Sequence, residues 1–486
     1  MRRSVVCFAA LLASLSCCAQ DPPGKSASVH HPVTFSLFDR TRVDTWQWFA
    51  APPYSATYGY VQSLLRIGIA QKLDRWDWQL ELAQPAILDA PTDAVSPVAA
   101  QGQLGLGGTY YAANGNNDYP AAAFLKQGFV RYRFSGAGRN VRLGRFEFFD
   151  GQETRPTNAT IAWLQSHRIA QRLIGNFGFS NAQRSFDGLD ASYRFGSSTL
   201  TAMASRADQG VFNMNGNPEF NVDVQYLAFT HSAAHGHVLA RAFGIGYHDG
   251  RTGIAKTDNR ALPVRQADRH NIRLGTYGGD VLASIPAGPG SFDLVFWGAL
   301  QNGNWGVQSD SAGAAAVEGG YRLTSLKTSP WVRAGWFRST GDNNPTDNRH
   351  NTFFQILPTP RIYARTPFYN LMNSTDEFVQ VVDQPSRRLN LEADVHGLQL
   401  TSSKDLWYLG GGAFDNSVFG FVGRPASGHT SFATLVDGSA DWQTTHNVAL
   451  NFYYGYAQGK GAPTAIYPTG HSLQYGYVEM VYHWGD

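Results

Sequence analysis

Cysteine is nearly absent from the 486-residue chain, and its three copies, Cys7, Cys17 and Cys18, lie within the first 18 residues. If this leader is removed, no thiol remains, which excludes disulfide scaffolds, thiolate metal sites and cysteine nucleophiles. Long apolar runs are also absent after the leader, and a membrane-spanning helix needs roughly 18 such residues. A helical inner-membrane protein is therefore excluded.

The chain also lacks an excess of charge of either sign. It has 39 basic and 37 acidic residues, and the loss of Arg2 and Arg3 with the leader makes the two numbers equal. No bulk charge directs the chain to nucleic acid. Lysine is scarce, at seven of the 39 basic residues. Arginine binds carboxylates through two parallel hydrogen bonds, although a codon bias toward arginine explains the excess equally well.

The first residues have the pattern of a secretory signal peptide. Arg2 and Arg3 precede an apolar run at 5–15, and small residues follow. Cleavage after Ala19 is preferred, which gives a signal peptide at 1–19 and a short periplasmic segment at 20–32. The alternative is lipidation of Cys18, because residues 15–18 loosely resemble a lipobox. Either interpretation predicts export.

Strict alternation of apolar and polar residues is the main pattern of the remaining chain. Trp76, Trp78, Leu80 and Leu82 alternate with polar residues, and five further windows behave in the same way. Each window predicts a β-strand with one apolar and one polar face. About 467 mature residues, at roughly 26 per strand and connection, predict about 18 strands, with 16 as the alternative.

Four features favour an all-β transmembrane antiparallel barrel over a soluble sandwich. The chain is predicted to be exported, 13% of its residues are aromatic, and no linker or repeat divides 33–486 into domains. The last strand places Val478, Met480, Tyr482 and Trp484 on one face, which is typical of strands recognised by the barrel-assembly machinery. An outer-membrane location in a Gram-negative-type bacterium follows, with lipid around the apolar face. The tryptophans expected in interfacial girdles are Trp46, Trp48, Trp297, Trp331, Trp336, Trp407 and Trp442.

Long segments rich in proline or asparagine are expected to be extracellular loops, because periplasmic turns are short. They are 89–108, 152–185, 250–269 and 339–376. The last contains four prolines, which exclude an extended central strand over much of it. It also holds Arg361 and Arg365 among aromatic residues, a combination suited to an anionic, ring-shaped ligand.

The sequence contains no serine nucleophile elbow, no zinc helix with two histidines and no phosphate loop. We therefore expect neither catalysis nor a cofactor. The segment with Asp342 and Asp347 is the one candidate for a calcium loop. Pro345 and the lack of a following glycine and glutamate break that pattern, so an exposed turn without metal is preferred.

Strand parity places a set of arginines on polar, inward-facing positions. A lumen lined in this way concentrates anions. These residues are Arg40, Arg42, Arg66, Arg131, Arg133, Arg194 and Arg322. Inward acids would pair with many of them, as in general porins, so parity alone leaves anion selectivity open. The inward acids are Asp44, Glu81, Asp190, Glu318 and Asp394.

The run TFFQILPTPRIYARTPFYNLMN at 352–373, preceded by GDNNPTD, resembles the alginate export family of outer-membrane porins. Other pieces are similar to that family: LGRFEFFDG at 143–151, RLIGNFGFS at 172–180, RSFDGLDASY at 184–193, DLWYLGGGAF at 405–414 and FGFVGRP at 419–425. Together they cover most of the mature chain in order.

This resemblance implies a monomeric barrel of about 18 strands with an electropositive, arginine-lined constriction through which a polyuronate passes outward. It also implies that Arg145, Arg361 and Arg365 belong to the constriction. Parity places Arg145 on the face of Leu143, so an inward position there requires a bulge.

The expected function is an outer-membrane channel for an anionic, alginate-like polysaccharide or oligosaccharide. Transport by diffusion requires weak binding at several places, because a tight site would trap the polymer. Two alternatives stay open: a general or nutrient-uptake porin for small solutes, and an outer-membrane enzyme or surface-binding protein that uses the long loops.

Overall fold

The computed structural model describes residues 31–359 and 361–485. The predicted signal peptide at 1–19, its cleavage or lipidation site, and residues 20–30 of the N-terminal segment lie outside the described residues. Within the described ranges, no helix is long and apolar enough to cross a membrane.

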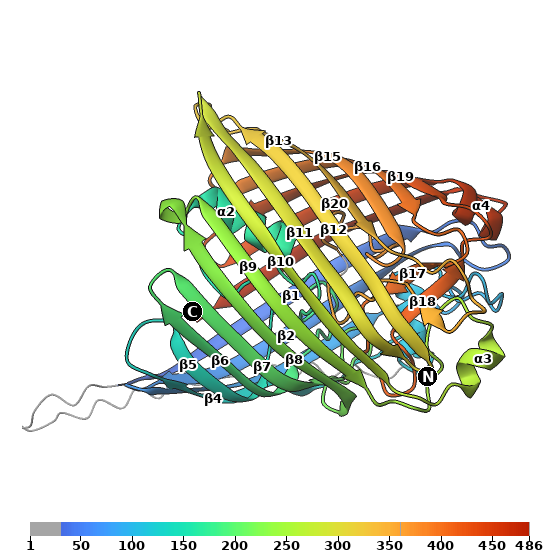
Figure 1. Ribbon diagram of the computed structural model, residues 1–486, viewed down its shortest axis with the longest axis horizontal. Coiled ribbons are helices and arrows are strands. Elements are labelled where there is room, and N and C mark those ends of the chain that lie inside the picture. The colour runs from blue at the N-terminus through green and yellow to red at the C-terminus, as the bar shows by residue number, and fades with distance from the viewer. Residues whose placement is uncertain (1–30, 360, 486) are drawn as a thin grey trace, which may run out of the picture.

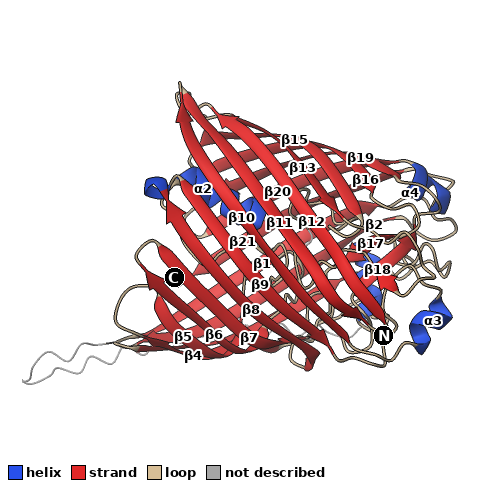
Figure 2. Cartoon of the chain, in the orientation of Figure 1, coloured by secondary structure: helices blue, strands red, loops and turns tan. Residues whose placement is uncertain are grey.

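A closed antiparallel barrel of 18 strands forms the body of the molecule (Figures 1 and 2). Consecutive barrel strands are paired, and the first strand closes the ring by pairing with the last. The predicted fold class is confirmed. The barrel strands are β1 (Val33–Gln47), β2 (Thr57–Lys72), β3 (Trp76–Leu88), β4 (Phe124–Arg133), β5 (Arg139–Phe146), β6 (Phe186–Phe195), β7 (Ser198–Asp208), β8 (Glu219–Ala233), β9 (Val238–Asp249), β10 (Ile272–Ala287), β11 (Gly290–Trp305), β12 (Gln308–Arg322), β13 (Trp331–Ser339), β15 (Ser374–Ser386), β16 (Leu389–Leu400), β19 (Ser431–Gln443), β20 (Val448–Gly459) and β21 (Ser472–Trp484).

The remaining elements lie in the connections between barrel strands. A two-residue strand runs parallel to β12, and a separate hairpin forms in the connection from β16 to β19. These elements are α1 (Leu106–Ala113), α2 (Ala159–Leu164) with a π-helical turn (Gln165–Ile169), a 3-10 turn (Ala234–Gly236), α3 (Leu262–Ala267), β14 (Arg349–His350), β17 (Leu406–Gly410), β18 (Phe421–Pro425) and α4 (Gly461–Ile466).

The two faces of the barrel strands differ as the alternation predicts. On β3, the side chains of Leu80 and Leu82 are 46% and 60% exposed, whereas Glu81 between them is 9% exposed. Exposed leucine, valine and phenylalanine recur on the outer face of β10, β11 and β15. The apolar face therefore points outward, where a membrane barrel meets lipid, and the polar face points into the lumen.

The predicted tryptophan girdles are mostly wrong. Trp336 and Trp442 are exposed on the outer face. The other five are at most 3% exposed, because they point inward and pack against the connections that enter the barrel. The buried ones are Trp46, Trp48, Trp297, Trp331 and Trp407. Near the end of a strand, the alternation of residues does not show whether a tryptophan contacts lipid or packs against loops inside the barrel.

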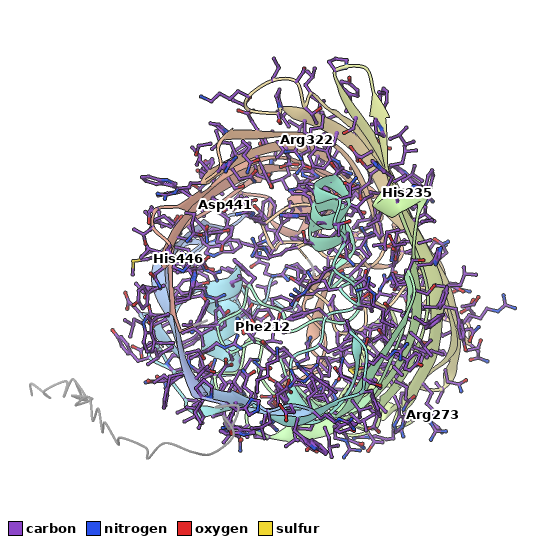
Figure 3. The ribbon with its side chains drawn as sticks, turned by 90° about the vertical axis from the view of Figure 1, so that its left-hand side faces the viewer. Phe212, His235, Arg273, Arg322, Asp441 and His446 are labelled. Carbon is purple, nitrogen blue, oxygen red and sulfur yellow. The ribbon has the colours of Figure 1, made fainter. Side chains whose placement is uncertain are left out.

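Long and short connections lie at opposite ends of the barrel. Short turns occupy the end that holds Val33 and Trp484, while the long connections, with α3, α4 and the β17–β18 hairpin, occupy the other end together with the short β11–β12 turn (Figure 1). The connection 147–185 folds into the lumen, and Figure 3 shows its helix inside the barrel. Its Ile161 and Leu164 are fully buried, so burial of apolar side chains holds the loop in the lumen.

Candidate functional site

The 147–185 and 340–373 connections are joined to each other inside the barrel. Ile174 and Leu357 form a parallel β-bridge. The bridge consists of backbone hydrogen bonds from Leu357 N to Leu173 O and from Gly175 N to Leu357 O, both at 2.8 Å, and Thr359 N donates to Gln171 O at 2.9 Å. The two loops therefore form one hydrogen-bonded unit within the lumen.

Arg184 attaches a third connection to this unit. Its guanidinium is fully buried, and burial lowers the pKa of Arg184 to about 10, so it stays cationic at neutral pH. Four carbonyl oxygens accept its hydrogen bonds at 2.9–3.1 Å: those of Gly175, Leu357, Gly411 and Ala413. The last two belong to the 401–430 connection, so one side chain holds three loops together.

Residues 148–173 cover the wall from β8 to β13. The buried arginines there pair with buried acidic side chains of the loop and the strands. Glu318 of β12 lies 3.1 Å from Arg333, 3.3 Å from Arg168 and 3.9 Å from Arg172. The side chains of these arginines are at most 3% exposed. We call this part of the lumen the filled half. Because burial requires paired charges there, Glu318 holds the loop to the wall rather than lining a pore.

Arg241 organises a second cluster in the filled half. Its guanidinium lies 2.7 Å from Asp280, 3.3 Å from Glu153 and 3.7 Å from Asp150. Asp150 also accepts hydrogen bonds from the backbone N–H groups of Leu173 and Ile174. Burial raises the pKa of Asp150 to about 6, and Arg241 opposes this rise.

The wall formed by β19–β21 and β1–β6 is buried at the long-connection end but has partly exposed inward residues toward the short-turn end, and we call this wall the open half. Arg40 and Arg42 of β1 point inward there, as predicted by parity. They donate to the carbonyl oxygens of Gly178, Ser180 and Phe179 at 2.5, 2.7 and 3.1 Å. The acids nearest to them are Asp44 at 3.1 Å and Glu479 at 3.5–3.7 Å. Both arginines thus anchor the end of the 147–185 loop.

Arg66 of β2 is inward and partly exposed, at 13% of its side chain. It contacts Glu81 at 2.5 Å and Glu147 at 3.0 Å, and it donates to Gln183 at 3.0 Å. Lys126 lies 3.5 Å from the same Glu147. Burial alone would raise the pKa of Glu147, but Arg66 and Lys126 overcome it and lower the pKa to about 2.

The two motif arginines of the 340–373 loop have different surroundings. Arg365 forms two hydrogen bonds to Asp441 of β19, at 2.6 and 2.9 Å, so it anchors the loop to the wall. Arg361 is partly exposed, and in the described part of the chain no carboxylate lies within 4.0 Å of it. Its guanidinium lies 3.4 Å from the ring centre of Phe179, which Arg42 contacts at 3.8 Å.

Arg131 and Arg133 lie in the open half near the short-turn end, and both are 3.7 Å from Asp77. Their side chains are 32% and 25% exposed. Arg194 is exposed at the same end. Arg322 lies near that end on β12, with its guanidinium 5.5 Å from the ring centre of Trp331.

Arg145 lies on the outer face, contrary to its expected place in the constriction. The β5–β6 register is regular, and it places Arg145 opposite Asp187 two residues from the exposed pair Leu143 and Leu189. Arg145 binds Asp187 and donates to the carbonyl oxygen of Asn217 at 3.0 Å. No bulge turns it inward.

Sequence parity missed several charged residues of the lumen. Arg142 of β5 is inward and pairs with Asp190 of β6; its alternation with Leu143 was a usable signal. Arg168, Arg172 and Arg184 belong to a loop, where no periodicity marks a direction.

The proposed calcium ligands serve as turn caps. Asp342 accepts the backbone N–H of Asn344 at 3.0 Å, and Asp347 accepts that of Arg349 at 3.0 Å. Across 31–359 and 361–485, no three His, Cys, Asp or Glu side chains converge as a metal site requires.

Solved outer-membrane proteins share the fold. OccAB2 of Acinetobacter baumannii is similar at a TM-score of 0.59, covering 93% of this chain and 98% of that one at 8% identity. OccAB1 of the same organism has a TM-score of 0.58, covering 93% of this chain and 96% of that one at 11% identity. OpdK of Pseudomonas aeruginosa, solved with vanillate, has a TM-score of 0.57, covering 93% of this chain and 99% of that one at 7% identity. Identities this low show the fold alone, and no curated protein matches the sequence.

The sequence itself matches one family model. The model described as "Alginate export" matches residues 98–458, well over half of the chain. This match includes the central motif and all three loops that Arg184 joins, and it agrees with the resemblance seen in the sequence. Family and fold are both of the channel type. The chain therefore belongs to the alginate export family of outer-membrane β-barrel channels.

Proposed function

We propose that this outer-membrane channel passes an anionic polysaccharide or oligosaccharide through the open half of its lumen, past arginine side chains. A single barrel chain and the diffusing polymer are sufficient for this function. The observation that carries the proposal is the state of Arg361, a partly exposed guanidinium with no carboxylate within 4.0 Å in the described chain.

Arg361 offers two kinds of contact to a uronate. Its free hydrogen-bond donors suit a carboxylate. The adjacent ring of Phe179, at 3.4 Å from Arg361 and 3.8 Å from Arg42, supplies a flat apolar surface. The neighbouring cations are already engaged by carbonyl groups or acids, so a passing polymer meets one strong contact at a time. Such weak binding supports passage rather than trapping.

A cleft at the short-turn end suits the approach of a polyanion. It lies between the β2–β3 and β4–β5 turns, and basic side chains outnumber its single carboxylate, Asp74. Concentrated positive charge attracts a polyanion from solution and raises its local concentration. The basic residues are Lys72, Arg75, Arg131, Arg133 and Arg139.

Planar-bilayer recording tests the proposal. Wild-type current should be blocked by oligomannuronate, and the Arg361→Gln variant should weaken this block by about tenfold or more, as loss of one charge-assisted hydrogen bond predicts. Arg273→Gln is the matched control, because Arg273 is exposed on the outer face of β10. Cation preference of the wild type, or an undiminished block in Arg361→Gln, would overturn the proposal.

A second candidate is a channel for small solutes. The observation that favours it is the extent of filling: three loops joined by Arg184 occupy much of the lumen. One solved relative in fold, OpdK, was crystallised with the small molecule vanillate. In the same recordings, block by monomeric uronate equal to that by the oligomer would favour this candidate.

A further inference from the structure

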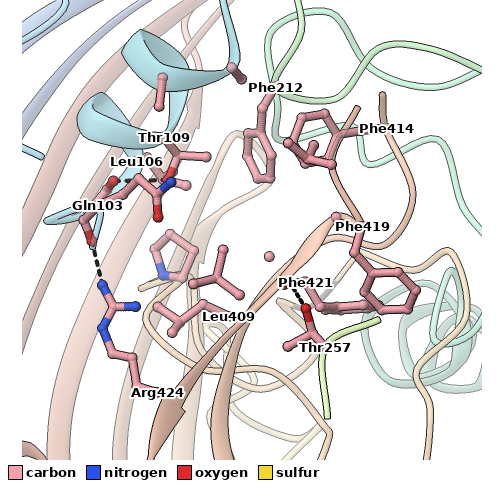
Figure 4. A pocket seen from close by; sticks show the side chains of 18 of the residues that line it. Gln103, Leu106, Thr109, Phe212, Thr257, Leu409, Phe414, Phe419, Phe421 and Arg424 are labelled. Atoms are coloured by element: carbon pink, nitrogen blue, oxygen red, sulfur yellow. Dashed lines mark hydrogen bonds between the residues drawn. The ribbon is translucent and has the colours of Figure 1, made fainter. Parts of the chain in front are cut away.

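A separate cavity of about 340 Å³ lies in the layer of loops at the long-connection end (Figure 4). It is bounded by α1, the β17–β18 hairpin and the segment 254–257. Its walls are mainly apolar and aromatic, with Phe212, Phe414, Phe419 and Phe421 among them. A volume of this size is at the lower end of small-molecule sites and fits a single ring rather than a polymer.

One cation lies at the edge of this apolar space. Arg424 of β18 is 1% exposed, and its guanidinium lies 5.5 Å from the ring centre of Trp48 and 5.2 Å from that of Trp407. Its Nε donates to the Tyr467 hydroxyl at 2.9 Å and its Nη2 to the Gln103 carbonyl at 2.5 Å. In Figure 4 the other terminal nitrogen faces the cavity.

The charge of Arg424 has no acidic partner within the described ranges, where no carboxylate lies within 4.0 Å of it. Arg184 is also buried without an acid, but four carbonyl oxygens accept its hydrogen bonds. Arg424 has only two acceptors. A buried cation without compensation is unfavourable, and an anion in the cavity would remove that cost.

We propose that this cavity binds a small aromatic carboxylate, with its ring against the phenylalanine wall and its carboxylate paired with Arg424. The aromatic faces offer edge-to-face and stacked contacts. The planar guanidinium matches the geometry of a carboxylate. A polyuronate does not fit this site, because its hydroxyl groups would lose water against apolar walls without gaining partners.

Binding of benzoate to the detergent-solubilised full chain tests the site, measured by tryptophan fluorescence and by calorimetry. Trp48 and Trp407 flank Arg424, so occupation of the cavity should change their emission. We expect benzoate to bind at least about tenfold more tightly than benzamide, which lacks the charge, or acetate, which lacks the ring. Equal binding of benzoate and benzamide, or none of benzoate, would overturn the proposal.

Two variants locate the site. Arg424→Gln should weaken benzoate binding by about tenfold or more, and Ala113→Phe, which places a ring in the cavity from α1 and leaves Arg424 unchanged in the sequence, should abolish it. Arg273→Gln on the outer face should bind benzoate as the wild type does. If Arg424→Gln fails to fold, unchanged binding by Ala113→Phe still refutes the site. The inference goes beyond the polysaccharide channel, since benzoate binding and oligomannuronate block are measured separately and fail separately.

Discussion

The filled and open halves of the lumen both contain many arginines, but they use them differently. In the filled half, the side chains of Arg168, Arg172 and Arg333 are at most 3% exposed and share Glu318. In the open half, Arg131, Arg133 and Arg365 are 24–32% exposed, and Arg361 has no carboxylate within 4.0 Å among the described residues. Exposure, rather than the number of arginines, therefore distinguishes these arginines of the open half from the cluster around Glu318.

The largest loss of stability should come from removing the charge of Glu318, which pairs with three arginines in the filled half. Glu318→Gln leaves three buried guanidiniums with less negative charge, and we expect a loss of about 3–5 kcal/mol in the free energy of unfolding. Urea titration followed by the mobility of unheated samples in gels measures it. Asp190→Asn is the control in the open half: it breaks the pair with Arg142, whose side chains are 13% and 15% exposed, and should cost less than Glu318→Gln because a single cation loses its partner there. Equal losses would contradict the distinction between the halves.

Releasing the three loops should have the next largest effect. Arg184→Gln removes most of the hydrogen bonds to Gly175, Leu357, Gly411 and Ala413. We expect the loops to fluctuate, which should raise the mean single-channel conductance and its noise. A variant with quiet, wild-type currents would show that Arg184 is not needed to hold the loops.

Breaking the contacts that Arg365 of the 340–373 loop makes with the barrel wall should have a smaller effect on the current. Arg365→Gln removes the cation from Asp441 and Glu392, which leaves two carboxylates facing the open half. The ratio of anion to cation permeability, measured from reversal potentials, should fall by several-fold, because the local charge becomes negative. An unchanged ratio would place these residues outside the conducting path.

Acid should act on the open half through Glu147. The pKa of Glu147 is raised by burial but lowered further by Arg66 and Lys126, from 4.5 to about 2. This carboxylate therefore stabilises the loop at pH above 4.5, and that contribution is lost as the pH falls through about 2. The contribution of Glu147 to the conductance, taken as the difference between the wild type and Glu147→Gln, should be constant from about pH 8 to about pH 5 and change only in stronger acid. Glu147→Gln should show the altered conductance already at neutral pH; an identical acid transition in that variant would exclude Glu147 as its cause.

Strand alternation predicted the strands and the inward positions of Arg40, Arg42 and Arg66, because a period of two fixes which face a strand residue occupies. The barrel was predicted from export, aromatic content, the lack of linkers and the last strand, and its strand number from the chain length. It failed where the lumen is filled. Trp48 and Trp407 were expected at the lipid interface, but they stack on each other inside, with ring centres 6.1 Å apart. Periodicity carries no information about loops, so the anchoring roles of Arg168, Arg172 and Arg184 were not visible in the sequence.

The family motif predicted which loop contains the two arginines, but it did not predict what each of them contacts. The motif contains both Arg361 and Arg365, and only their surroundings differ: Arg365 is bound to Asp441, whereas no carboxylate lies within 4.0 Å of Arg361 among the described residues. Arg145 belongs to a similar motif fragment but lies on the outer face with Asp187. A motif match assigns a residue to a family position, whereas its electrostatic partners decide what it does.

The most direct test uses the absence of cysteine after residue 18. Ser439→Cys places a single thiol on the inward face of β19 in the open half, and Ser284→Cys places one on the inward face of β10 in the filled half. The rate at which anionic and cationic methanethiosulfonate reagents change the current is then measured for each. We predict fast modification of Ser439→Cys, faster with the anionic reagent, and protection of Ser284→Cys. Equal reactivity at both positions, or a preference for the cationic reagent at Ser439→Cys, would contradict the account.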